Sequence, residues 1–194
     1  MKTTQILLAG FGGQGILFAG KFLAYKGLVQ DMQVSWLPSY GPEMRGGTAN
    51  CNVILSDMPV GSPIVTTPDV LVAMNLPSLQ KFVDTVAPGG IIILDSTLIH
   101  AKVDRTDVKV CYVPATQMAK DAGFATLANM VLVGKVLKES GCAAFDGTMR
   151  PWRPSSLPRR QASSTSTARL CRWATITRVN HSNENHRSDG AVVF

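Results

Sequence analysis

The chain has 194 residues, of which 45% are hydrophobic, and this is enough for one well-buried core with a small appendage. Its longest apolar runs, such as residues 91–94, are far too short to cross a bilayer, which excludes a membrane-spanning protein. The net charge of +6 divides into +1 for residues 1–142 and +5 for residues 143–194, so the nearly neutral first part lacks a nucleic-acid-binding footprint.

The first predicted elements are a strand over residues 6–9, a glycine-rich turn, and a helix from Gly15 to about Val29. No signal-peptide architecture precedes the strand, so we expect a cytoplasmic protein. Gly10, Gly12 and Gly15 have the G-x-G-x-x-G spacing. In that spacing the first glycine permits a sharp turn, the second lets a phosphate approach the backbone, and the third lets the helix pack close to the strand.

The N–H groups at the start of this helix would favour an anion, because the helix dipole is positive there. Taken alone the spacing is weak evidence, since glycine turns also serve only to pack a helix on a sheet. The helix itself is apolar over most of its circumference, with Lys21 and Lys26 marking its solvent side. We therefore predict a buried crossover helix in which the small residues Gly20 and Ala24 allow close packing.

A dinucleotide site expects an acidic residue about 20 residues after the glycine turn, where it binds the ribose. The second predicted strand, residues 33–37, continues into Pro38, Ser39 and Tyr40 without an Asp or Glu. An NAD-dependent dehydrogenase domain is therefore disfavoured, whereas a nucleotide-binding type of fold is not.

Residues 39–47 are too polar and too rich in glycine and proline for a regular element. They leave the second strand at its carboxyl end, where open α/β sheets hold their ligands. Glu43 and Arg45 could form a solvated ion pair of little energetic value. Their position near the glycine turn favours a functional loop instead.

The rest of the first part alternates between strands and helices. We predict strands over residues 49–55, 70–74, 91–94 and 109–113, and helices over residues 77–86, 115–122 and 126–140. Such alternation predicts an α/β, Rossmann-like, three-layer domain with a mostly parallel sheet and helices on both faces. The continuous β-branched run at 91–94 indicates a strand that is buried on both faces.

The four cysteines, at positions 51, 111, 142 and 171, show no Cys-x-x-Cys spacing. They fit neither a disulfide framework nor a zinc or iron–sulfur site, and we interpret them as reduced, partly buried thiols. The sequence also offers no nucleophile–base pair and no paired carboxylates. We therefore predict no catalytic residue and no metal site in this chain.

The composition changes abruptly after Cys142. Residues 143–194 contain eight arginines and no lysine, and they show no sustained apolar period. A basic tail for nucleic acid usually contains lysine as well as arginine, so we favour a segment that is disordered or translated out of frame. We accordingly predict a domain over residues 1–142 and an atypical arginine-rich segment over residues 143–194.

Four segments together resemble the gamma subunit of 2-oxoacid:ferredoxin oxidoreductases: residues 9–15, 39–49, 75–79 and 88–91. The second is long and unusual, so it is far more specific than the glycine turn. The similarity covers about residues 4–142. The terminal helical part expected of such a subunit is replaced here by the arginine-rich segment.

The resemblance implies a subunit of a complex that oxidatively decarboxylates a 2-oxoacid to an acyl-CoA and reduces ferredoxin. Among the oxoacids 2-oxoglutarate is favoured, with branched-chain oxoacids and pyruvate behind it. It implies alpha, beta and ferredoxin-like delta subunits as partners. Thiamine diphosphate, Mg and 4Fe-4S clusters are expected on those partners, and coenzyme A is expected as a cosubstrate near this chain. No tightly bound cofactor, no nucleic acid and no membrane partner is expected for the chain itself.

We assign the candidate cofactor contacts to two groups of residues. They are Gly10, Gly12, Gly13, Gln14 and Gly15 in the turn, and Ser39, Tyr40, Glu43, Arg45, Gly46 and Gly47 in the following loop. The alternative from a different class is a stand-alone nucleotide- or phosphate-binding module without a redox role. A monomer that binds a nucleotide tightly would favour that alternative.

Overall fold

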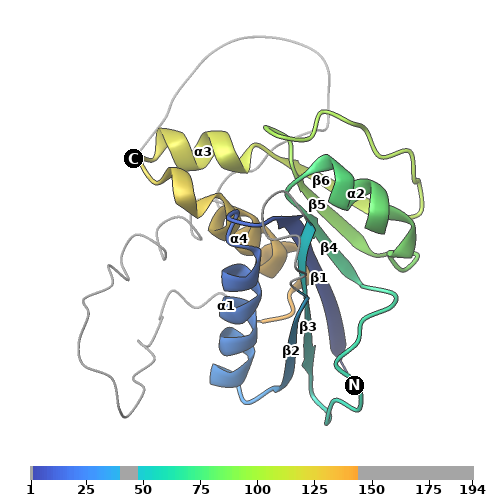
Figure 1. Ribbon diagram of the computed structural model, residues 1–194. Coiled ribbons are helices and arrows are strands. Elements are labelled where there is room, and N and C mark those ends of the chain that lie inside the picture. The colour runs from blue at the N-terminus through green and yellow to red at the C-terminus, as the bar shows by residue number, and fades with distance from the viewer. Residues whose placement is uncertain (1, 40–47, 144–194) are drawn as a thin grey trace, which may run out of the picture.

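The computed structural model describes residues 2–39 and 48–143 (Figure 1). Predictions that fall on residues 40–47 or 144–194 therefore lie outside the described residues. The strands are β1 (Thr3–Phe11), β2 (Gln33–Ser39), β3 (Thr48–Ser56), β4 (Val70–Ala73), β5 (Ile91–Asp95) and β6 (Lys109–Val113). The helices are α1 (Ile16–Val29), α2 (Leu76–Phe82), α3 (Ala115–Asp121) and α4 (Ala128–Ser140), with short 3-10 turns η1 (Val83–Thr85) and η2 (Ala125–Leu127).

The described strands form one sheet in the order β2-β3-β1-β4-β5-β6. The pairs β1–β4, β4–β5 and β5–β6 are parallel. Strand β3 runs antiparallel to both of its neighbours, β1 and β2, so β2 points in the same direction as β1. The mostly parallel sheet predicted from the alternation of strands and helices is confirmed.

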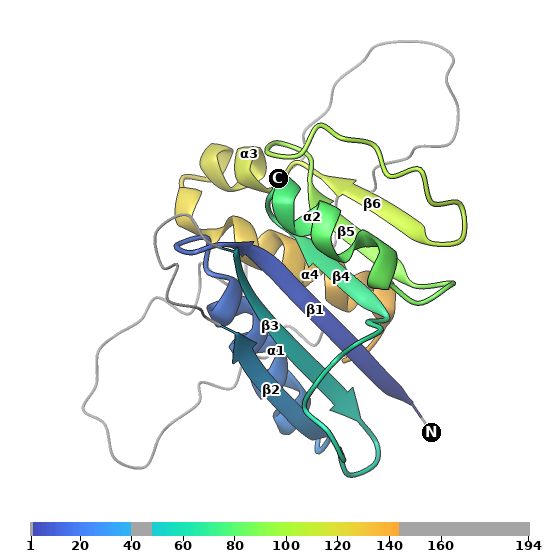
Figure 2. The same cartoon turned by 45° about the vertical axis from the view of Figure 1, so that its right-hand side comes forward.

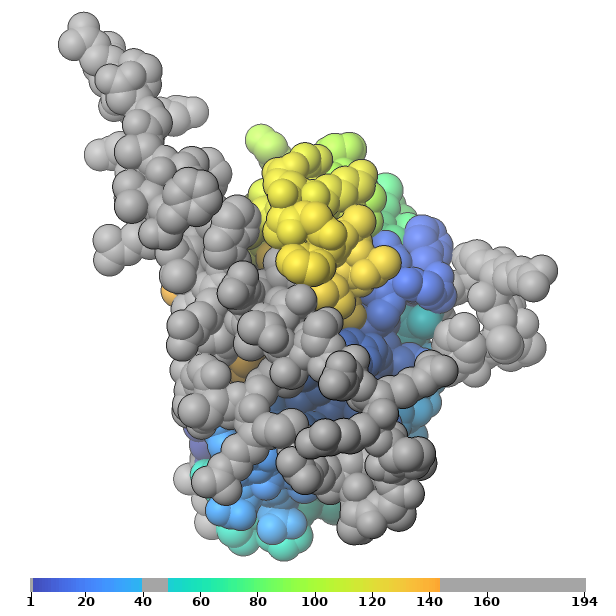
Figure 3. Space-filling model, turned by 90° about the vertical axis from the view of Figure 1, so that its left-hand side faces the viewer, coloured from blue at the N-terminus to red at the C-terminus, as the bar shows by residue number. Residues whose placement is uncertain are grey.

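Helices cover both faces of this sheet, which confirms the three-layer, Rossmann-like prediction. Helices α1, α3 and α4 lie on one face, and α2 lies on the other (Figures 1 and 2). Helix α1 packs on β2 and β3, and α4 packs on β4 and β5. Figure 3 views the molecule from the first face, with α3 in yellow at one end and α1 in blue.

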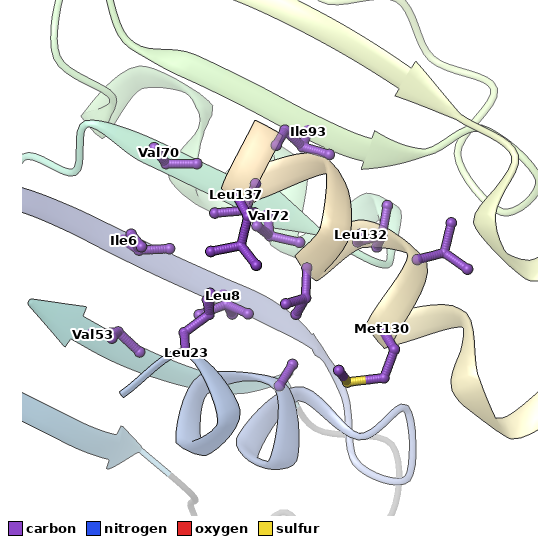
Figure 4. Close-up of a cluster of buried hydrophobic side chains, with 14 of the residues drawn as sticks. Ile6, Leu8, Leu23, Val53, Val70, Val72, Ile93, Met130, Leu132 and Leu137 are labelled. Carbon is purple, nitrogen blue, oxygen red and sulfur yellow. The ribbon is translucent and has the colours of Figure 1, made fainter. Parts of the chain in front are cut away.

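The core is divided into two layers by the sheet, because successive side chains of a strand point to opposite faces. Ile6 and Leu8 of β1 pack toward α1 and α4, together with Leu23 and Met130 from the helices (Figure 4). Leu7, the residue between them, belongs to the second cluster on the α2 side. Each apolar face of the central strands is thus removed from water by a helix layer, and this burial is the main stabilising contribution to the fold.

Strand β5 is buried on both faces, as its β-branched run predicted. Ile93 belongs to the cluster under α1 and α4, whereas Ile92 and Leu94 belong to the cluster under α2. All three side chains are 0% exposed.

Several boundaries differ from the sequence prediction. The helix predicted over residues 77–86 divides into α2 and the 3-10 turn η1. The helix predicted over residues 126–140 begins as the 3-10 turn η2, and α4 itself starts at Ala128. Strand β6 has the predicted bounds. Terminal turns of helices commonly tighten in this way, because their last backbone groups lack partners within the α-helix.

The predicted solvent side of α1 was wrong at Lys26, which is only 8% exposed. A lysine can bury its methylene stem along an apolar surface, and here its neighbour Gly27 lies against the sheet. The outer side of α1 instead exposes Phe18 by 53% and Leu28 by 58%. The close packing expected at Gly20 is confirmed, because a Cβ there would lie 2.3 Å from the Cys51 sulfur.

Candidate functional site

The candidate site lies at the sheet edge where β1 and β4 end. These two strands are parallel neighbours. Strand β1 leads into α1 on one face, and β4 leads into α2 on the opposite face (Figure 2). The chain therefore departs in two directions from adjacent strands, which is the topological switch point where open α/β sheets bind their ligands.

The glycine turn after β1 adopts a left-handed backbone at two positions. Gly13 has φ 95° and Gly15 has φ 75°, a region that disfavours residues with a Cβ. Gly15 is the N-cap of α1 and, as a glycine, offers no side chain of its own to cap the helix. A Cβ at Gly13 would meet no atom within 4 Å, so its backbone is open to the surroundings.

The role predicted for the first glycine of the motif was wrong. Gly10 is still part of β1, paired with Ala49, and does not make the turn. It is small because α1 starts close above it: a Cβ there would lie 2.8 Å from Ile16 Cδ1. The left-handed backbone of the turn lies at Gly13 and Gly15 instead. The G-x-G-x-x-G spacing is thus present, but Gly10 serves packing, and Gly15 combines a left-handed backbone with close packing, since a Cβ there would lie 2.5 Å from Asn129 Nδ2.

Gln14 connects the ends of the two strands at the switch point. Its Oε1 accepts a hydrogen bond from the Phe11 backbone N–H at 2.6 Å. Its Nε2 donates to the Met74 carbonyl at 3.0 Å, just after β4. Both functional groups of the side chain are therefore engaged within the protein, and Gln14 is placed to shape the turn.

Asn129, which the sequence did not single out, holds the turn from the other side. Its Nδ2 donates to the Gly15 carbonyl at 2.9 Å, and its Oδ1 accepts from the Met130 backbone N–H at 3.0 Å. The side chain is only 3% exposed. An asparagine within an apolar helical stretch was the available signal, but its partner is 114 positions away in the sequence.

Ser39 is the last residue of β2 and is exposed. It lies opposite Asn50 of β3, which also lies opposite Ala9 of β1, so Ser39 is level with the end of β1. Thr48, at the start of β3, pairs with Phe11 beside the glycine turn. Strand β2 thus ends, and β3 begins, at the predicted edge of the sheet. The remaining loop candidates, Tyr40, Glu43, Arg45, Gly46 and Gly47, lie outside the described residues.

Asn75 and Ser78 add two buried polar side chains beside the switch point, and neither was among the predicted site residues. Asn75 caps α2, its Oδ1 accepting from the Ser78 backbone N–H at 2.8 Å. Asn75 is 4% exposed and Ser78 is 0% exposed. Within the described part of the chain, Asn75 Nδ2 and Ser78 Oγ have no hydrogen-bond partner. In the sequence, both residues lie in segment 75–79, one of the four segments that resemble the gamma subunits.

The described cysteines are buried thiols with little nucleophilic character. Burial raises the pKa of Cys51 to about 12, and it also raises the pKa values of Cys111 and Cys142. Such thiols stay protonated at neutral pH, and the thiolate is the reactive form. Among residues 2–39 and 48–143, no group of three His, Cys, Asp or Glu side chains could hold a metal ion. No helix in these ranges is long and apolar enough to span a bilayer.

Residues 5–152 match the family described as pyruvate ferredoxin/flavodoxin oxidoreductase. The chain belongs to this family. The match spans the predicted domain and continues past residue 142 into the arginine-rich segment.

One relative in this family is the ketoisovalerate oxidoreductase subunit VorA of Methanothermobacter thermautotrophicus. It is 48% identical over 142 residues, which are 73% of this chain but 29% of VorA. The chain therefore spans about three tenths of the length of that relative, and VorA contains further sequence that this chain does not match.

Two solved structures of oxidoreductases from this family are also similar. The gamma subunit of a keto/oxoacid ferredoxin oxidoreductase from Geobacter sulfurreducens has a TM-score of 0.70 and 27% identity, over 90% of this chain and 93% of that one. The 2-oxoglutarate:ferredoxin oxidoreductase of Magnetococcus marinus, solved with 2-oxoglutarate, coenzyme A and succinyl-CoA bound, has a TM-score of 0.65 and 26% identity. That match covers 71% of this chain and 24% of the other. The resemblance to gamma subunits of this family is confirmed.

Proposed function

We propose that this chain is the gamma subunit of a cytoplasmic 2-oxoacid:ferredoxin oxidoreductase, and that its glycine turn contacts the phosphates of coenzyme A. The complex would oxidatively decarboxylate a 2-oxoacid, transfer the acyl group to coenzyme A and pass the electrons to ferredoxin. The observation that carries the proposal is the open backbone at Gly13, in the turn at the switch point between β1 and β4.

The chemistry of the turn suits a phosphate. The first N–H groups of a helix have no partner within the helix, and the helix dipole favours negative charge at that end. The N-cap of α1 is Gly15, which has no side chain to accept a hydrogen bond from these N–H groups, so an anion could take that place. Because Gln14 is engaged by Phe11 and Met74, it would act by holding the turn and not by direct contact.

The remaining cofactors are proposed for partner subunits. Thiamine diphosphate, Mg and the 4Fe-4S clusters would be held by alpha, beta and ferredoxin-like delta subunits. The absence of a reactive thiol and of a metal-binding cluster among the described residues is compatible with that division. When bound, thiamine diphosphate would supply the decarboxylation chemistry, and this chain would supply binding surface for coenzyme A and for its partners.

Two oxoacids are candidates for the complex. The motifs favour 2-oxoglutarate, which is bound in the similar Magnetococcus marinus enzyme. The 48% identity to a ketoisovalerate oxidoreductase subunit favours a branched-chain oxoacid as the second candidate. Assays of the complex with each oxoacid, at equal concentrations and with the same ferredoxin, will distinguish them by kcat/KM.

The glycine turn is tested in the assembled complex with Gly12→Val. A Val side chain at the second glycine of the motif should obstruct the approach of a phosphate to the backbone, so we expect the KM for coenzyme A to rise about tenfold or more. Gly61→Val is the matched control, because Gly61 lies in another loop and a Cβ there meets nothing within 4 Å. A Gly12→Val complex with unchanged dependence on coenzyme A would remove the turn from the proposal.

The alternative function is a stand-alone nucleotide- or phosphate-binding module without a redox role. It would be supported by a purified monomer that binds a nucleotide tightly and does not associate with thiamine-binding or ferredoxin-like partners. The similarity to gamma subunits of oxidoreductases favours the subunit instead.

A further inference from the structure

The connection between β5 and β6 is a structured loop that lies apart from the glycine turn. Residues 96–108 join two parallel strands without a regular helix, and most such crossovers contain one. Ordered loops of this length usually carry a function. This loop lies on the α2 side of the sheet, since its Ile99 is part of the cluster under α2.

Several contacts fix the shape of the loop. Arg105 donates hydrogen bonds to the Val83 and Val86 carbonyls at 2.7 and 2.9 Å, and it forms an ion pair with Asp107. The Tyr112 hydroxyl accepts from the Val103 backbone N–H at 3.1 Å. Ile99 is 1% exposed and anchors the start of the loop. The loop borders a cavity that is open to solvent, and interactions spread along the loop hold its wall in place.

That cavity has a volume of about 350 Å³ and is lined by Ser96, Ile99, His100, Lys102 and Tyr112. Its lining contains two basic side chains and two hydroxyls but no carboxylate. Within the part of the chain that the structure describes, neither His100 nor Lys102 forms an ion pair or a hydrogen bond. The Tyr112 hydroxyl is engaged only as an acceptor, so its own O–H can still donate.

Lys102 lines two neighbouring cavities. The second has a volume of about 440 Å³ and is also lined by Asp84, Asp104 and Arg105. Arg105 is paired with Asp107, and Lys102 and His100 are the nitrogen-bearing side chains of the first cavity. The carboxylates line the second cavity and not the first.

From this arrangement we propose that the cavity of Ser96, His100, Lys102 and Tyr112 binds a small molecule through an anionic oxygen group, either a phosphate or a carboxylate. Lys102 supplies the charge, the imidazole of His100 supplies an N–H, and the two hydroxyls donate further hydrogen bonds to the same group. Ile99 offers an apolar wall for the remainder of the ligand. The site rests on the β5–β6 loop and is independent of the proposed contact with coenzyme A at the glycine turn.

The test uses the full 194-residue chain, labelled with ¹⁵N and titrated by NMR. Inorganic phosphate and propionate are added in separate experiments, with the ionic strength held constant by chloride. We expect saturable shifts of the Ser96, His100 and Tyr112 amides with at least one anion. The anion whose shifts saturate at the lower concentration shows whether the site prefers a phosphate or a carboxylate.

Lys102→Gln should lower the association constant about tenfold, because a charge-assisted hydrogen bond is lost. The matched control is Lys120→Gln, which removes the same charge from an exposed position on α3 and should change the constant less than about twofold. The proposal is overturned if neither anion gives saturable shifts at these amides. Equal losses in the two variants would also overturn it, since they would show only general attraction to a positive surface.

Discussion

Ser78 carries a hydroxyl that is fully buried beside the switch point and has no hydrogen-bond partner among the described residues. An unpaired buried donor costs about 1–3 kcal/mol of stability. We therefore expect Ser78→Ala to raise the free energy of unfolding by about 1 kcal/mol, as measured by urea denaturation.

Asn75→Ala provides the contrast, because it removes the side chain that caps α2. Loss of such a cap lowers the free energy of unfolding by about 1 kcal/mol. If Ser78→Ala were as destabilising as Asn75→Ala, the hydroxyl would have a partner in solution, such as an ordered water.

Arg45 belongs to the segment between β2 and β3 that lies outside the described residues, and its proposed role rests on its guanidinium. A planar guanidinium holds a phosphate or carboxylate with two parallel hydrogen bonds, which a lysine cannot reproduce. Arg45→Lys should therefore raise the KM for coenzyme A or lower the yield of assembled complex severalfold. Wild-type kinetics together with a wild-type yield would return Arg45 to an ordinary surface position.

At the scale of elements, Glu139 joins the edge strand β6 to the end of α4. Its carboxylate forms ion pairs of 2.6 Å with Lys109 of β6 and with Lys135 one turn earlier in α4. Burial alone would raise the pKa of Glu139, but the hydrogen bonds from Lys109 and Lys135 outweigh it and lower that pKa below its ordinary value of 4.5. The charged form is therefore favoured by folding.

This pKa shift gives the stability a defined dependence on pH. A carboxyl group whose pKa is lowered in the folded state stabilises the fold above its unfolded pKa, and the contribution disappears as the pH falls through the folded pKa. At pH 7 the free energy of unfolding of the wild type should exceed that of Glu139→Gln by less than about 1 kcal/mol, since the site is partly exposed. This difference in the free energy of unfolding, measured by urea denaturation, should become smaller below about pH 4. A gap that does not change with pH would mean that the ion pairs contribute nothing.

The sequence predicted elements well where a local pattern decided them. The β-branched run of β5 and the short strand β6 were found because each pattern is complete within a few residues. The contacts of Gln14 with Met74 and of Asn129 with Gly15 could not be found, because each depends on a neighbour brought close only by the fold. Lys26 was placed on the wrong side for a related reason: periodicity does not show how far a lysine stem can be buried.

At the scale of the whole molecule, the change of composition after Cys142 yields a test on the coding DNA. If the arginine-rich segment results from a shifted frame, moving the frame by one base near codon 143 should produce a lysine-containing amphipathic helix. Sequencing the encoding DNA is the measurement. A frame that gives no such helix in either direction would leave residues 143–194 as the genuine end of this chain.

The reversed direction of β3 has a consequence for how this fold can diversify. Because β2 runs toward the sheet edge where β1 and β4 end, and β3 runs away from it, the connection between them starts and ends at that edge. Residues can be added to or removed from such a hairpin without altering the pairing of the strands, and the entropic cost of extra length grows slowly. Related proteins could therefore exchange this one connection, and with it their recognition properties, on an unchanged scaffold.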